Sequence, residues 1–158
     1  MVSVTRRYHF SASHRLHSPS LSDTENAALF GKCNNPFGHG HNYILSVTVT
    51  GEIDERTGLL VSVRKLDALL HDKVLNQFSH CNLNTDVADF TDLIPTTENI
   101  AAVIAGRLQK FWAQYLNGRR VHLQRVHILE TKKNGFEIVM RAAAATNECE
   151  QEGVSIHA

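Results

Sequence analysis

The sequence predicts an α+β fold, in which a small antiparallel sheet carries two amphipathic helices on one face. Residues 43–52 alternate between apolar and polar side chains, which is typical of a half-buried strand. Residues 63–78 and 96–116 instead repeat their apolar side chains at helical spacing. A chain of 158 residues is expected to form one domain, here over 1–141, and the polar stretch 142–158 is predicted to be a flexible tail.

The first half of the chain is expected to hold three extended segments and one helix. Strands are predicted at residues 4–12 and 43–52. Turn-forming residues at 52–58 follow, and the apolar run at 59–61 predicts a further extended segment. Ser62 can then cap the first helix, because its hydroxyl can accept a hydrogen bond from a free backbone N–H of the first turn.

The second helix is predicted to begin after Pro95. Thr96 or Thr97 can act as its N-cap, and Glu98 lies in the first turn, where a negative charge interacts favourably with the helix dipole. One stripe of apolar side chains continues to the Asn-Gly pair at 117–118. This pair is expected to stop the helix.

Residues 125–131 and 136–141 are predicted to be the last two strands, because Asn-Gly at 134–135 is a strong signal for a tight hairpin. If both helices cover one face of the sheet, its opposite face and its edges are left to solvent, although several strands alternate in a way that suggests burial. Oligomerisation is the simplest way to cover these surfaces.

Charge and composition exclude several classes of protein. Lysine plus arginine and aspartate plus glutamate number 16 each, so nothing favours a nucleic acid or an anionic membrane as partner. No apolar run approaches the roughly 18 residues of a membrane span, and the N-terminal segment lacks the apolar core of a signal peptide. The three cysteines are widely spaced, which suits a reducing compartment. A cytoplasmic protein is expected.

Three histidines are candidates for a metal site. His39 and His41 stand at i and i+2, so in an extended chain both imidazoles project from the same face. Because the chain has 10 histidines, such a pair arises easily by chance, and surface or core histidines are the alternative interpretation. His14 supplies a third imidazole, and three imidazoles without a fourth protein ligand are typical of catalytic zinc, whose open position takes water or substrate.

Other side chains in or near these motifs have two interpretations each. Cys33 is either a small buried hydrophobic residue or, in its loop beside Lys32 and near a metal, a thiolate that can remove a proton. Glu130, at the end of a predicted strand, can form an ion pair or act as a ligand, and the sequence does not separate these. The Thr96 to Glu98 segment is explained most simply as a helix cap with a favourable acid.

Five separated blocks of the sequence resemble the 6-pyruvoyltetrahydropterin synthase family. They contain the histidines, the cysteine and the acidic residues described above, and they follow the same order as in that family. The blocks are residues 10–16, 30–43, 51–54, 96–99 and 130–131. The similarity extends over about residues 4–141, and five ordered blocks are far more specific than any single motif.

The resemblance implies a tunnelling fold (T-fold). In this family a four-stranded antiparallel sheet with two helices on one face forms a barrel on trimerisation, and two trimers stack into a homo-hexamer with active sites between subunits. The implied activity is a zinc-dependent lyase reaction of tetrahydrobiopterin biosynthesis. It converts 7,8-dihydroneopterin triphosphate into 6-pyruvoyl tetrahydropterin and eliminates triphosphate.

The resemblance also implies roles for individual residues. The zinc ligands would be His14, His39 and His41, and Cys33 would be the general base that takes a proton from the substrate side chain. Glu130 matches the carboxylate that anchors the pterin ring through two hydrogen bonds. Residues of the substrate pocket would be Thr96, Thr97 and Glu98, and the basic residues near the motifs, which are only candidates for the triphosphate, are Arg15, Lys32 and Arg64.

One departure from the family pattern concerns the catalytic histidine. The family usually has an aspartate before the residue that matches His80, and this chain has Ser79 there. A serine hydroxyl can orient an imidazole but cannot stabilise an imidazolium by charge. A slower enzyme or a shifted pH optimum is therefore expected, unless a carboxylate of the following loop takes over. Those carboxylates belong to Asp86, Asp89 and Asp92.

Two other functions remain open from the sequence. 6-Carboxytetrahydropterin synthases, which share substrate and fold, typically have three residues between the cysteine and the His-Gly-His motif, whereas five residues separate Cys33 from His39 here. This spacing favours the pyruvoyl product. The change at Ser79 leaves a second alternative, a pterin- or zinc-binding homologue with weakened catalysis.

Overall fold

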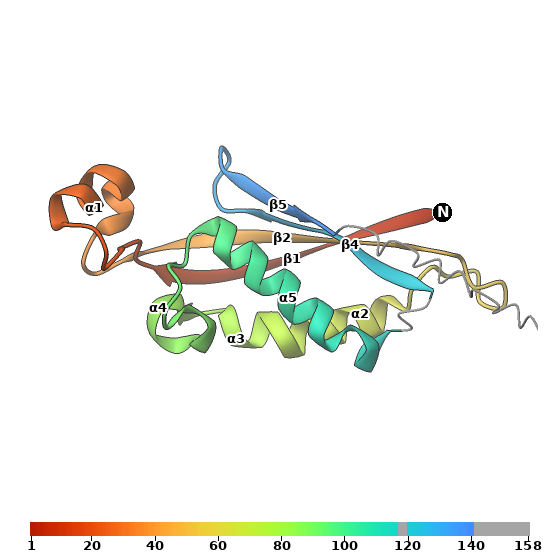
Figure 1. Cartoon of the computed structure of the whole chain (residues 1–158). Helices are drawn as coiled ribbons and strands as arrows, with labels where there is room; N and C mark the ends of the chain where they lie inside the picture. Colours follow the sequence, from red (N-terminus) through yellow and green to blue (C-terminus); the bar gives the residue numbers. More distant parts are fainter. Residues whose placement is uncertain (117–119, 141–158) are drawn as a thin grey trace, which may run out of the picture.

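The computed structural model describes residues 1–116 and 120–140, which form one mixed sheet with helices packed on one face (Figure 1). The sheet has five strands in the order β3-β1-β2-β4-β5. β3 runs parallel to β1, and the other neighbours are antiparallel. The strands are β1 (Val2–His14), β2 (His39–Gly51), β3 (Cys81–Asn82), β4 (Val121–Leu129) and β5 (Gly135–Val139).

Two predictions about the sheet are wrong. The four-stranded prediction omitted β3, which is only two residues long and therefore has no periodicity to detect. The predicted extended segment at 59–61 is not a strand, because the Leu59 carbonyl accepts a hydrogen bond from Asp54 and closes the preceding turn. Val61 is buried and packs into the core as part of the connection to the next helix.

The two long strands extend further than the apolar alternation predicted. β1 and β2 pair along their whole length, from Val2 opposite Gly51 to His14 opposite His39. At the histidine end the last paired residues are polar or glycine, so the apolar pattern ends there before the hydrogen-bonded ladder does. This extension places the predicted histidines at the end of the sheet.

The predicted helix at 63–78 is a continuous helical path with an irregular centre. α2 (Val63–Leu70) begins at Ser62, whose side chain accepts a hydrogen bond from the Lys65 N–H as predicted. A π-helical turn, η2 (His71–Leu75), follows, and α3 (Asn76–Phe78) completes the path. A single wide turn of this kind inside an apolar stripe leaves little trace in the sequence pattern.

The second predicted helix is α5 (Thr97–Tyr115), with Thr96 as its N-cap. It lies beside α2 and α3 on the same face of the sheet (Figure 1). The expected stop at 117–118 and the predicted tail at 142–158 lie outside the described residues. Short helices after β3 are α4 (Leu83–Asp86) and η3 (Ala88–Phe90).

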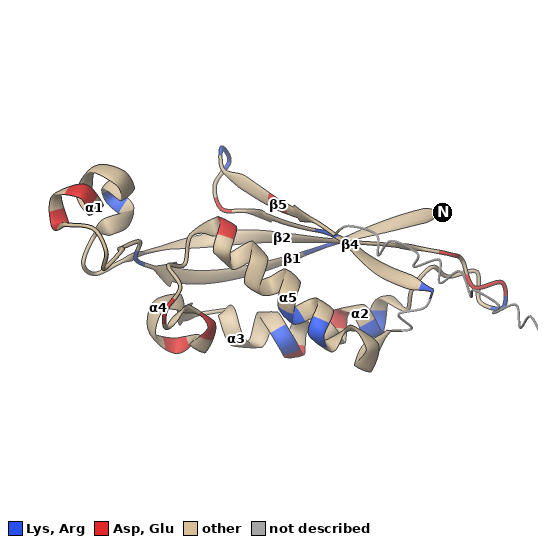
Figure 2. Ribbon diagram, in the orientation of Figure 1, with Lys and Arg blue, Asp and Glu red and all other residues tan. Residues whose placement is uncertain are grey.

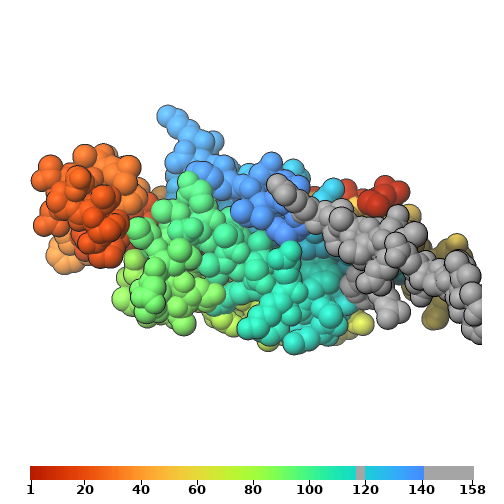
Figure 3. Space-filling view, viewed as in Figure 1, coloured from red at the N-terminus to blue at the C-terminus, as the bar shows by residue number. Residues whose placement is uncertain are grey.

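The connection between β1 and β2 contains α1 (Asp23–Phe30) and η1 (Gly31–Asn34), and it projects from one end of the molecule (Figure 3). The sequence analysis missed α1, which has no apolar stripe. Its support is local: Ser22 and Glu25 form a capping box, and the buried Asn26 side chain binds three backbone carbonyls of the preceding loop.

The hydrophobic core lies between the sheet and the helical layer. Side chains at alternate positions of β1 and β2 face the helices, whereas Ser11, Ser13 and Asn42 face the opposite side. Charged residues lie mainly on the helices and loops (Figure 2). No helix in the described part of the chain is long and apolar enough to cross a membrane. Fully buried core residues include Tyr43, Leu45, Leu66, Leu69, Phe78, Ile100, Ile104, Leu108 and Ile128.

Candidate functional site

Three imidazoles meet where β1 ends and β2 begins. The antiparallel register sets His14 opposite His39 and Ala12 opposite His41. Because side chains alternate along a strand, all three histidines face the helical side of the sheet. The Nε2 atoms of His14 and His39 lie 3.3 Å apart, and one ring nitrogen from each histidine lies within 4.8 Å of the others. This cluster can hold a metal ion.

His14 is held in one orientation by the segment before α5. Its side chain is 1% exposed, and its Nδ1 lies 2.8 Å from the carbonyl oxygen of Pro95. A carbonyl oxygen can only accept, so Nδ1 carries the proton and Nε2 is left free to face the cluster. Burial lowers the pKa of His14 and of His39. Neutral imidazoles are the form that binds metal.

An unpaired nitrogen of His41 also fits a metal. Among the described residues, the buried atoms His39 Nδ1 and His41 Nε2 have no hydrogen-bond partner. Leaving a buried polar atom unpaired costs free energy, so such atoms need an explanation. A metal ion coordinated by the three histidines would supply the partner that His41 Nε2 lacks.

Glu130 reaches the same cluster from another strand. It follows the end of β4, where Leu129 pairs with Ile44. Its Oε1 accepts a 2.8 Å hydrogen bond from the hydroxyl of Thr97. The same oxygen lies 3.8 Å from His14 Nε2 and 3.7 Å from His41 Nε2. Pro95 and Thr97 thus tie the start of α5 to both a histidine and the carboxylate.

Cys33 lies in η1, where its carbonyl accepts a 2.8 Å hydrogen bond from the N–H of Leu16, just beyond β1. Burial raises the pKa of the Cys33 thiol, and the negative charge of Glu130 raises it further. In the chain by itself, the surroundings therefore favour the neutral thiol. Lys32 is exposed and does not offset this.

The side chains of Thr96, Thr97 and Glu98 have three different environments. The Thr96 hydroxyl caps α5 by accepting from the N–H of Asn99. Thr97 is 4% exposed and donates to Glu130. Glu98 is exposed, and its side chain makes no hydrogen bond within residues 1–116 and 120–140. Only Thr97 of the three forms a hydrogen bond with Glu130, the carboxylate that reaches the cluster.

Comparison with known proteins now identifies the family. The family model described as 6-pyruvoyl tetrahydropterin synthase matches residues 3–140. The chain belongs to the 6-pyruvoyl tetrahydropterin synthase family. This confirms the resemblance inferred from the five sequence blocks.

Individual relatives agree with this assignment. The human 6-pyruvoyl tetrahydrobiopterin synthase is 52% identical over 107 residues, which cover 68% of this chain and 74% of the human protein. The Drosophila melanogaster protein of the same name is 44% identical over 133 residues, or 83% of this chain and 75% of that protein. The solved structure of Caenorhabditis elegans 6-pyruvoyl tetrahydropterin synthase has 40% identity and a TM-score of 0.79, covering 89% of this chain and 96% of the other.

His80, expected from the family pattern to be catalytic, lies in a different environment. It has a left-handed backbone, φ 61°, and its N–H donates a 2.6 Å hydrogen bond to the carbonyl of Ser11. Such a conformation costs free energy in a non-glycine residue and is often found at functional sites. The pairing of β3 with β1 holds it in place.

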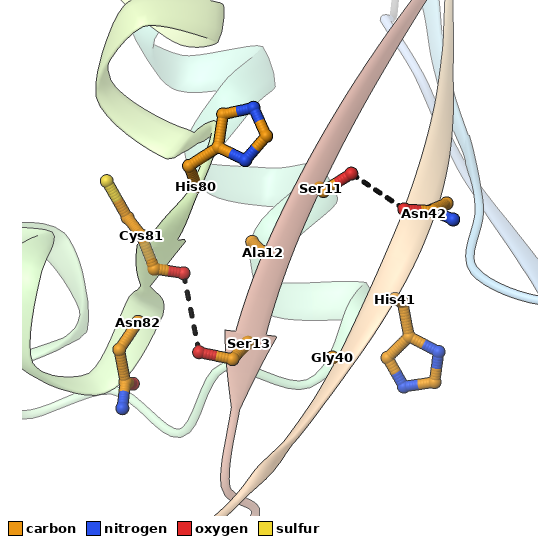
Figure 4. Close-up of a pocket in the computed structure, with 9 residues that line it drawn as sticks. All are labelled: Ser11, Ala12, Ser13, Gly40, His41, Asn42, His80, Cys81 and Asn82. Carbon is orange, nitrogen blue, oxygen red and sulfur yellow. Dashed lines mark hydrogen bonds between the residues drawn. The ribbon is translucent and has the colours of Figure 1, made fainter.

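His80 lines a cavity of about 410 Å³ beside the first two strands. Figure 4 shows His80 next to β1 and His41 beyond β2, so both strands lie between the two rings. Within the described residues, the lining of this cavity includes His41 but neither Cys33 nor Glu130. Within one chain, His80 and Cys33 therefore do not line the same cavity.

Ser79 and the loop carboxylates do not provide a ready partner for His80. In the described part of the chain, the Ser79 hydroxyl has no hydrogen bond to the imidazole. Asp86 accepts from the N–H of Asn82 and the hydroxyl of Thr85, and Asp89 pairs with Arg107. Both carboxylates are thus engaged elsewhere, and Asp92 is exposed.

Two residues beside the histidine cluster, Pro95 and Tyr43, were not predicted from the sequence. Pro95 acts through its backbone carbonyl, which carries no sequence signal. Tyr43 is fully buried, stacks on Phe10 with ring centroids 4.9 Å apart, and lies 5.6 Å from the His41 ring. Burial raises the pKa of its hydroxyl, with a contribution from Glu130. Its position two residues after His41 could have indicated that it faces the same side.

Proposed function

We propose that the protein is a 6-pyruvoyl tetrahydropterin synthase. It converts 7,8-dihydroneopterin triphosphate into 6-pyruvoyl tetrahydropterin and eliminates triphosphate, a lyase reaction of tetrahydrobiopterin biosynthesis. The observation that carries this proposal is the convergence of three imidazoles and Glu130 at one end of the sheet, in a chain of this family.

Zinc is the proposed metal, and His14, His39 and His41 would hold it. Three nitrogen ligands are typical of catalytic zinc sites. The Pro95 carbonyl fixes the tautomer of His14, as partners of metal-binding histidines usually do. When bound, zinc acts as a Lewis acid that stabilises negative charge on a substrate oxygen.

Glu130 is the proposed pterin anchor. A carboxylate matches the adjacent N–H donors of a pterin ring through two parallel hydrogen bonds. The Thr97 hydroxyl already donates to Oε1, so Thr97 would act through Glu130 by setting the position of the carboxylate. Thr96 and Glu98 would line the entrance as neighbours of this residue.

Cys33 is the proposed general base that removes a proton from the substrate side chain. A thiolate is required for this step, whereas burial and Glu130 favour the thiol in the chain by itself. Pairing of Glu130 with a cationic or hydrogen-bonding ligand would weaken this effect. Binding of the substrate at Glu130 would then favour the thiolate of Cys33.

His80 and Ser79 would complete the site from a second copy of the chain. In the sheet, β1 and β2 lie between β3, which follows His80, and β4, which precedes Glu130. Polar side chains of β1 and β2 on the face opposite the helices would meet the partner. A T-fold assembly, in which three sheets form a barrel and two trimers form a homo-hexamer, would bring these groups together. His80 would then shuttle protons beside the cysteine of its neighbour.

We also propose that residues 1–141 act as one domain and that the protein works in the cytoplasm. Cys33 and Cys81 are free thiols, which agrees with a reducing compartment. The main test is product identification. Zinc-loaded protein incubated with 7,8-dihydroneopterin triphosphate should release triphosphate and 6-pyruvoyl tetrahydropterin, identified by mass. A 6-carboxy product, or no turnover with zinc bound, would overturn the proposal.

A further inference from the structure

The position of Glu130 relative to the histidines resembles that of a metal ligand. Two ligand atoms on one tetrahedral zinc ion lie about 3.3 Å apart when the bonds are about 2.0 Å long. The Nε2 atoms of His14 and His39 are 3.3 Å apart. Oε1 of Glu130 lies 3.8 Å and 3.7 Å from the Nε2 atoms of His14 and His41. These two distances are about 0.5 Å and 0.4 Å longer than a shared ion requires, and among the described residues only the three histidines have ligand atoms that all lie within 4.8 Å of one another, so Glu130 would have to move toward the ion to bind it.

The negative charge of Glu130 is also expected to be balanced by a cation. Its side chain is 13% exposed, and a largely buried carboxylate is costly unless it is paired. Among the described residues, no lysine or arginine forms a salt bridge with it, and the nearest basic groups are the imidazoles of His14 and His41. If those imidazoles bind a metal as neutral ligands, they do not balance the charge, whereas the ion does.

The contact with Thr97 fits the same interpretation. Carboxylates that bind zinc usually accept a further hydrogen bond, which fixes the direction of the oxygen. Thr97 is 4% exposed and donates its hydroxyl to Oε1, the same oxygen that approaches the histidines. The start of α5 thus aims this oxygen at the cluster.

We propose that Glu130 is the fourth protein ligand of the metal in the substrate-free protein. The expected open coordination position is then closed until a ligand arrives. A carboxylate oxygen that accepts hydrogen bonds from a pterin ring leaves the metal. Binding of the ring would therefore free a coordination position on the metal. This second step rests on the proposed function.

The test compares three proteins loaded with Co²⁺, whose visible absorption reports the number and type of ligands. These are the unchanged protein, Glu130→Gln, and Glu98→Gln as a control that removes an exposed carboxylate from the first turn of α5. Glu130→Gln is expected to change the Co²⁺ spectrum and to weaken Zn²⁺ binding at least about tenfold, measured by competition with a chelator. Glu98→Gln should change neither.

The Co²⁺ spectrum tests directly whether Glu130 is a metal ligand. If Glu130→Gln and the unchanged protein have the same Co²⁺ spectrum, Glu130 is not a ligand, even if its charge affects metal affinity. Addition of 7,8-dihydroneopterin should shift the spectrum of the unchanged protein. If the Glu130→Gln spectrum differs but 7,8-dihydroneopterin does not bind, the ligand assignment stands and the proposed function fails. If the substrate is turned over and the two spectra coincide, only the present inference fails.

Discussion

Thr97 donates a 2.8 Å hydrogen bond to Oε1 of Glu130, joining the first residue of α5 to the residue that follows β4. The two residues are 33 positions apart in the sequence. Because the Thr97 hydroxyl donates to Oε1, it is expected to set the direction of the carboxylate.

Thr97→Val should raise the KM for the pterin substrate about tenfold, because it removes a hydrogen bond to a charged group while keeping the shape of the side chain. Steady-state kinetics would measure this. Thr96→Val is the matched control: it removes the N-cap of α5 and should cost about 1 kcal/mol of stability without a comparable change in KM. Equal KM values for Thr97→Val and the unchanged protein would show that Thr97 does not position Glu130.

Cys33→Ala and His39→Ala should separate catalysis from metal binding. Cys33→Ala is expected to abolish turnover and retain zinc, since the thiol is the proposed base and not a ligand. His39→Ala should lose zinc, because it removes one of three ring nitrogens within 4.8 Å of one another. Metal analysis and a turnover assay would test both. Cys81→Ala serves as a control, and full zinc content in His39→Ala would contradict the ligand assignment.

Ser79→Asp should increase turnover, because an aspartate before His80 can stabilise an imidazolium by charge. Neither Asp86 nor Asp89 is free to substitute for it, since both already have partners. The rate at saturating substrate would be measured across pH. An unchanged or lower rate would show that the missing aspartate does not limit this protein.

Asp89→Asn should lower stability at neutral pH and have little effect in acid. The ion pair and hydrogen bonds with Arg107 hold the pKa of Asp89 below its ordinary value. A lowered carboxyl pKa contributes stability above the ordinary value of about 3.9, and this contribution is lost as pH falls through the lowered pKa. Thermal unfolding from pH 7 to pH 2 should show the two proteins converging. A constant difference across this range would exclude the linkage.

Tyr43→Phe and Tyr8→Phe should differ in stability although both remove one buried hydroxyl. The Tyr8 hydroxyl donates a 2.8 Å hydrogen bond to Asp67, so its removal should cost about 1 kcal/mol. The Tyr43 hydroxyl has no partner among the described residues, and phenylalanine keeps the stacking on Phe10. Tyr43→Phe should therefore be neutral or stabilising. Denaturant unfolding measures both, and an equal loss in the two variants would contradict this.

Much of the fold could be predicted because its main elements bury long periodic stripes. The helix that begins at Ser62, the helix α5 and the two long strands have apolar repeats of many residues. The elements that were missed or wrong are short or locally stabilised. β3 has two residues, and α1 depends on a capping box and on Asn26 instead of an apolar face.

The sequence by itself determined the family, the two helices, the long strands and the residues able to bind a metal. Tertiary structure alone decided that Pro95, 81 residues after His14, fixes its ring, and that Glu130 points its charge at two of the histidines. It also decided that His80 lies across two strands from them. Apolar periodicity reports which face of one element is buried, whereas the approach of side chains from different elements depends on strand register and on how α5 packs against the sheet.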